Sequence, residues 1–158
     1  MKCDCSMAAP PSAQDARESL NASAAAIGAE INAKHGPRIG WKQLLLILED
    51  RCCARYPCEV VFDAAPLQPG ECANPVARGN HPADGFTMYV HPFFMMRLDQ
   101  VPLLALYQLV LVNYGAFATP NDAETLGAAA LGLAKDEYYY SLCGLADELG
   151  QPASPGEQ

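Results

Sequence analysis

The stretch from Phe86 to Phe117 constrains the fold most, because it is the most apolar part of the chain. Apolar and more polar side chains alternate over residues 86–91 at its start. A period of two is typical of a strand with one face in the core. A second run rich in β-forming residues covers 58–63. The two runs predict a small antiparallel two-stranded hairpin.

A helix over about 100–117 follows the second of these runs. Pro102 falls in its first turn, where the missing backbone N–H would have no intrahelical partner in any case. Between residues 103 and 112 the only strongly polar residue is Gln108. A helix that is apolar on nearly every side belongs at the centre of a domain. It is too short to span a bilayer, which needs roughly 20 apolar residues.

Four other helices are predicted from apolar residues spaced three and four apart and from capping signals. The clearest start is Thr119 as N-cap, followed by Pro120 and then Asp122. The four helices cover about 13–35, 41–53, 120–131 and 136–149. The fold class is therefore α+β and mostly α, with about five helices packed around the central apolar helix and the hairpin covering one end.

One globular domain over residues 12–150 accounts for most of the chain. At 158 residues and 51% hydrophobic composition, the chain can bury a single core of ordinary size. Small residues and two prolines in 1–11 predict a flexible arm, and 151–158 predict a disordered tail.

The acidic charge excludes several classes of partner. The formal net charge is -8 and the sequence pI is about 4.7. Phosphate binding needs a basic footprint, so a nucleic-acid partner is not expected, and neither is an anionic membrane surface. The first residues contain no apolar run of about 7 to 15 residues, which a secretory signal requires. We therefore expect a cytoplasmic protein.

The segment 64–85 is the first place to look for function. It holds four prolines and three glycines in 22 residues, a density that rules out long regular structure. A loop of this length in a compact domain is typical of a binding segment or of a disordered one.

A set of cysteines and histidines predicts a site for zinc or another thiophilic metal. Thiolate and imidazole are the ligands that such metals select. The candidate metal ligands are Cys3, Cys5, Cys72, His81 and His91.

The alternative is that most of the seven cysteines are structural. Free cysteine is among the most buried residue types, and the chain has no C-x-x-C pair. On this interpretation Cys52, Cys53, Cys58 and Cys143 are buried thiols, and Cys3 and Cys5 belong to the unstructured arm.

Consecutive tyrosines at 138–140 predict a surface for a protein partner, because successive helical positions point about 100° apart and at least one ring must face outward. Phe93 and Phe94 are apolar beyond what a turn needs and predict a further contact, either with a partner or between copies of the chain. The candidate partner-binding residues are Tyr138, Tyr139, Phe93 and Phe94.

Two functions remain open from the sequence. The leading interpretation is an acidic accessory or protein-binding module that handles a metal through thiols. The alternative is a small thiol- or metal-dependent hydrolase built from the 64–92 region, with Cys72 as nucleophile, a nearby histidine as base, and Asn80 or Asp84 as the orienting group. No spacing matches a catalytic motif with its own geometry, so no catalytic residue is assigned.

Overall fold

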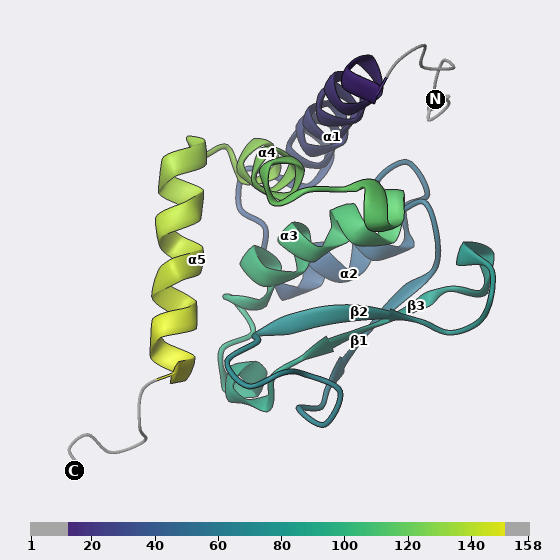
Figure 1. The fold of residues 1–158 in the computed structure, drawn as a ribbon. Coiled ribbons are helices and arrows are strands. Elements are labelled where there is room, and N and C mark those ends of the chain that lie inside the picture. The colour runs from purple at the N-terminus through teal and green to yellow at the C-terminus, as the bar shows by residue number, and fades with distance from the viewer. Residues whose placement is uncertain (1–12, 151–158) are drawn as a thin grey trace.

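The structure, a computed structural model, describes residues 13–150, so the predicted arm and tail lie outside the described part. Within that range the chain forms five α-helices and a three-stranded sheet, which confirms the α+β, mostly helical fold class (Figure 1). The helices are α1 (Ala13–His35), α2 (Trp41–Glu49), α3 (Val101–Tyr114), α4 (Pro120–Leu131) and α5 (Lys135–Gly150).

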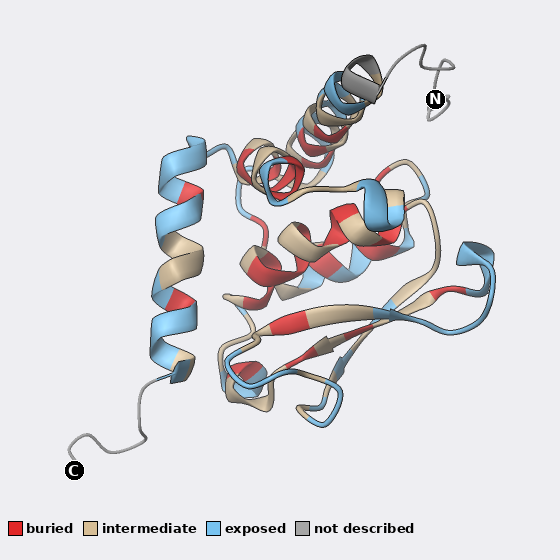
Figure 2. Ribbon diagram, viewed as in Figure 1, coloured by how far each residue is buried: buried red, intermediate tan, exposed pale blue. Residues whose placement is uncertain are grey.

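Helix α3 lies at the centre, as its composition predicts. It contacts α2, α4, α5 and two strands of the sheet, and most of its side chains are buried (Figures 1 and 2). Its one fully buried polar residue is Asn113. Among the described residues, no helix is long and apolar enough to cross a membrane.

Helices α1 and α4 pack closely along each other. Gly28 allows this approach, because a Cβ at that position would lie 2.5 Å from the carbonyl oxygen of Leu126. Polar side chains also join the two helices: the Asn21 amide donates to a carboxylate oxygen of Asp122 over 2.8 Å. Asp122 in turn accepts the backbone N–H of Thr119 over 2.9 Å, which forms the predicted cap at the start of α4.

The sheet differs from the predicted antiparallel pair. Its strands are β1 (Cys58–Phe62), β2 (Ala73–Ala77) and β3 (Phe86–Val90), in the order β1-β3-β2. Strand β3 pairs antiparallel with β2 and parallel with β1. The prediction that 58–63 and 86–91 pair as an antiparallel hairpin was therefore wrong, although both strands exist.

The physical reason lies in β2, which the proline-rich segment 64–85 contributes. Pro75 is tolerated there because β2 is an edge strand, and an edge can lack one backbone donor. Once β2 occupies one side of β3, β1 takes the other side. More than a dozen residues separate β1 from β3, which is enough for the crossover that a parallel pair requires.

Candidate metal centre

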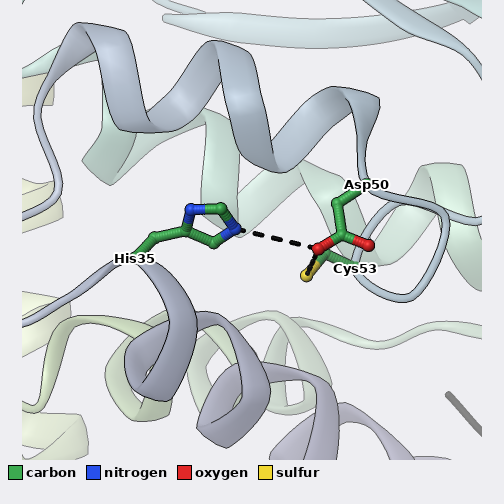
Figure 3. A group of neighbouring side chains, drawn as sticks. All are labelled: His35, Asp50 and Cys53. Carbon is green, nitrogen blue, oxygen red and sulfur yellow. Dashed lines mark hydrogen bonds and ion pairs between the residues drawn. The ribbon is translucent and has the colours of Figure 1, made fainter. Parts of the chain in front are cut away.

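Three side chains that bind metals meet between the ends of α1 and α2. His35 is the last residue of α1, Asp50 caps the C-terminus of α2, and Cys53 lies in the turn that follows (Figure 3). One ligand atom of each lies within 4.8 Å of the others, and this is the one group of three such residues found within residues 13–150.

Asp50 shapes the turn that carries the cysteine. Its side-chain Oδ1 accepts the N–H of Cys52 over 2.9 Å, and its backbone carbonyl accepts the N–H groups of Cys53 and Ala54. Aspartate favours such local bonds over continued helix. This is why α2 ends at Glu49 and not near Cys53, where the apolar spacing had placed its end.

Asn113 of the central helix α3 is hydrogen-bonded to the same turn. Its amide donates to the carbonyl of Cys53 over 2.8 Å, and its side-chain oxygen accepts the N–H of Arg55, also over 2.8 Å. Asn113 is only 3% exposed, so both bonds are shielded from water. The position of Cys53 is thus fixed by a side chain from the core of the domain.

Two of the three separations between the ligand atoms are close to those around a tetrahedral ion. The distance from Asp50 Oδ2 to Cys53 Sγ is 3.5 Å, and from Asp50 Oδ2 to His35 Nε2 it is 3.8 Å. Ligand atoms about 2.0 to 2.3 Å from a tetrahedral zinc lie about 3.3 to 3.7 Å from one another. These two separations are therefore close to those of a tetrahedral site, and the third, between Cys53 Sγ and His35 Nε2, is within 4.8 Å.

His35 supplies the strongest sign of a missing partner. Its Nε2 is buried and has no hydrogen-bond partner among the described residues. The 3.8 Å to Asp50 Oδ2 is beyond hydrogen-bond distance. Since buried polar atoms are nearly always satisfied, an orphaned imidazole nitrogen that faces a carboxylate and a thiol fits a metal ligand.

Asp50 is ionised and already neutralised by a lysine. Burial alone would raise the pKa of this carboxyl group, but hydrogen bonds from the Cys52 amide, Lys34 and Cys53 together hold it below its ordinary value of 3.8. Lys34 Nζ lies 2.9 Å from Asp50 Oδ2 and 3.1 Å from Glu30. Hydrogen bonds to these two carboxylates raise the pKa of Lys34, so a positive charge stands beside the centre.

Cys53 is a protonated thiol and not a nucleophile. It is fully buried, and burial together with the Asp50 carboxylate raises its pKa to about 12. Its thiol donates to Asp50. The three residues therefore do not form an activated cysteine with a histidine base, because that chemistry needs a populated thiolate. A metal ion, in contrast, displaces the proton of a coordinating thiol.

The predicted metal ligands lie elsewhere. Cys3 and Cys5 are outside the described residues. Cys72 precedes β2 and His91 follows β3, and the His91 N–H donates to the Cys72 carbonyl over 2.8 Å, so these two are neighbours across the sheet. His91 Nδ1 accepts the N–H of Phe93, and His81 lies exposed before a short 3-10 helix.

The four cysteines that the alternative interpretation described as buried thiols differ in their environments. Cys53 is fully buried, whereas Cys58 and Cys143 are half-buried free thiols. Cys52 is disulfide-bonded.

Two of the predicted partner-binding residues are in the core. Tyr138 and Phe94 are completely buried, and the Tyr138 hydroxyl donates to the carbonyl of Leu103 over 2.6 Å. Tyr139, at 48% exposed, is on the surface, and the half-buried Phe93 ring lies beneath the guanidinium of Arg97.

The sequence analysis missed His35 and Asp50 altogether. The available signal was the pair Asp50 and Cys53, three residues apart directly after an apolar helix, with His35 ending the preceding helix beside Gly36. Comparisons of the chain with protein-family models, with curated proteins and with solved structures found no match.

Proposed function

We propose that the protein is a metal-binding accessory protein whose centre is formed by His35, Asp50 and Cys53, with Zn²⁺ as the ion. The observation that carries this proposal is the orphaned, buried Nε2 of His35 facing a carboxylate and a thiol. One nitrogen, one oxygen and one sulfur donor form a borderline-soft set, which favours zinc over magnesium or calcium.

The proposal sets clear requirements for binding. Cys53 must release its proton to the solvent, and Lys34 must leave Asp50 Oδ2 while it keeps its contact with Glu30. Three protein ligands leave a fourth position for water or for a group from a partner protein. A site of this kind suits a metal carrier or a centre shared with a partner protein. Without the metal, the raised pKa of Cys53 leaves no thiolate for hydrolysis.

Metal titration of the reduced, metal-free protein tests the proposal. Co²⁺ serves as the spectroscopic probe, because thiolate coordination gives it visible absorption, and Zn²⁺ should displace it. We expect about one equivalent, with affinity that falls as pH falls because the ligands must lose protons. His35→Gln and Cys53→Ala should each abolish the signal.

Matched variants separate this centre from adventitious binding. His81→Gln changes an exposed histidine and Cys58→Ala removes a half-buried free thiol, and both should leave the titration unchanged. Binding that persists in His35→Gln and Cys53→Ala, or that is lost in the two control variants, would overturn the assignment.

Lys34 provides an independent test of the same centre. Because its ammonium group lies 2.9 Å from the ligand oxygen of Asp50, it competes with a metal cation for that oxygen. Lys34→Gln should therefore raise metal affinity severalfold in the Co²⁺ titration, whereas Lys42→Gln, an exposed lysine on α2, should not. Equal affinities of Lys34→Gln and the parent protein would contradict the model of competition.

The remaining parts of the proposal follow from the sequence. The acidity supports a protein partner and not a nucleic acid. A disulfide such as that of Cys52 is kept in oxidising compartments. Alkylation of the protein in intact cells, before lysis, distinguishes the compartments: an oxidised Cys52 would place the protein in an oxidising compartment, and a reduced Cys52 would place it in the cytoplasm, as the sequence predicts.

A further inference from the structure

A cavity lies apart from the candidate metal centre, and none of the metal ligands lines it. It has a volume of about 260 Å³ and is formed by α3, α5 and the segment 70–73 that leads into β2. Figure 1 shows α5 beside α3, and of the α5 residues only Tyr138 and Leu145 are buried.

Its walls are mainly apolar. Leu104 of α3 and Leu142 of α5 line it, together with Ala73 and Ala146. Apolar walls with a few polar groups are typical of sites for small organic molecules.

The only charge among the residues that line the cavity is negative. Glu71 is the one charged residue that lines it, and no lysine, arginine or histidine does so. The Glu71 carboxylate accepts the backbone N–H of Gln68 over 2.9 Å, which fixes its position at the rim. The Gln108 amide adds one neutral polar group.

Two tyrosine rings, Tyr107 and Tyr139, complete the lining. Both are neutral phenols: burial first and then Glu124 raise the pKa of Tyr107, and a hydrogen bond with Cys143 raises the pKa of Tyr139. The Cys72 thiol is neutral too, because burial and Glu71 raise its pKa. Aromatic faces together with a carboxylate attract cations.

We propose that this cavity binds a small organic ammonium ion, namely a primary amine with an apolar body, with Glu71 and the two tyrosine rings recognising the cation and Leu104 and Leu142 holding the body. A carboxylate or phosphate ligand would meet only negative charge there. This site does not depend on the metal centre, and neither proposal requires the other.

Three probes of similar size test the charge preference: 2-phenylethylamine, 2-phenylethanol and phenylacetate. Binding is followed by the amide chemical shifts of residues 70–73 and 142–146 in the full-length protein. The amine should bind about tenfold more tightly than the alcohol, since a cation near aromatic faces and a carboxylate is favoured by about that margin. Phenylacetate should bind most weakly.

Two substitutions distinguish the role of Glu71 from general acidity. Glu71→Gln keeps an oxygen that accepts the Gln68 N–H, so the rim should stay folded while the amine loses its advantage over the alcohol. Glu49→Gln, an exposed acid on α2, should change nothing. Ala146→Phe should fill the cavity and weaken all three probes.

The proposal is overturned if the alcohol binds as tightly as the amine, if the shifts occur outside the cavity, or if no probe binds at millimolar concentration. It is also overturned if Glu49→Gln reduces the amine preference as much as Glu71→Gln does.

Discussion

Asn113 shows how one side chain connects the core to the candidate metal centre. Replacing it with leucine would keep an apolar helix but leave the carbonyl of Cys53 and the N–H of Arg55 buried without partners. An unsatisfied buried group costs about 1 to 3 kcal/mol, so Asn113→Leu should lose more than about 2 kcal/mol of unfolding free energy in urea.

Gln108→Leu is the matched control for that substitution. Gln108 lies on the same helix but is half-buried and lines the cavity, where water can reach the groups around it. Its loss should stay below about 1 kcal/mol. If the two substitutions lower the unfolding free energy equally, the hydrogen bonds from Asn113 to the Cys53 turn do not contribute to stability as argued.

At the scale of helices, the contact between α4 and α5 depends on a glycine. A Cβ at Gly127 would lie 2.2 Å from ring atoms of Tyr138, which is fully buried and held by its bond to Leu103. Because the ring has no room to move, Gly127→Ala should destabilise the protein by about 2 kcal/mol. Thermal or urea unfolding measures this loss.

Gly144 provides the opposite case within α5. It is exposed, and a Cβ there would meet nothing within 4 Å. Gly144→Ala should therefore stabilise the protein by about 0.5 to 1 kcal/mol, because alanine loses less backbone entropy in a helix. A loss of stability in Gly144→Ala would show that α5 does not pack as described.

At the scale of the whole molecule, the helices were predictable and the sheet was not. The run from Leu103 to Val112 and the cap at Thr119 are local patterns, and both appear in the structure as predicted. Strand pairing depends on contacts between distant segments. Because Pro75 and the breakers around it argue against a strand, the sequence did not predict β2, and the antiparallel partner of β3 was missed.

The candidate metal centre was hidden for a related reason. His35 and Cys53 belong to no motif, and they meet only because α1 and α2 end at the same place. Cys72 and His91 are the opposite case, because the sequence selected both as ligands. The pairing of β2 with β3 makes them neighbours, but His91 Nδ1 already accepts the backbone N–H of Phe93. Sequence identifies residues with the right chemistry, and topology decides which of them meet.

The stability of the whole molecule at high pH tests the burial of Cys53. Its pKa is about 12 in the folded protein, against an ordinary value of 9.0 when unfolded. Because the folded value is raised, the stabilising effect of the neutral thiol is fully present below pH 9 and is lost as pH rises toward 12. The unfolding free energy should fall by about 1.4 kcal/mol per pH unit for this one group.

Urea unfolding of the reduced protein between pH 8 and pH 10.5 measures this slope. Cys53→Ala should lower the unfolding free energy at every pH, because it leaves a small cavity. It should also make the slope of unfolding free energy against pH less steep above pH 9, by the contribution of about one proton. Cys58→Ala should flatten it over a shorter range, since burial raises the pKa of Cys58 only to about 11. A slope that Cys53→Ala leaves unchanged would mean that the thiol is open to solvent, and the ligand set with His35 and Asp50 would then lose its buried donor.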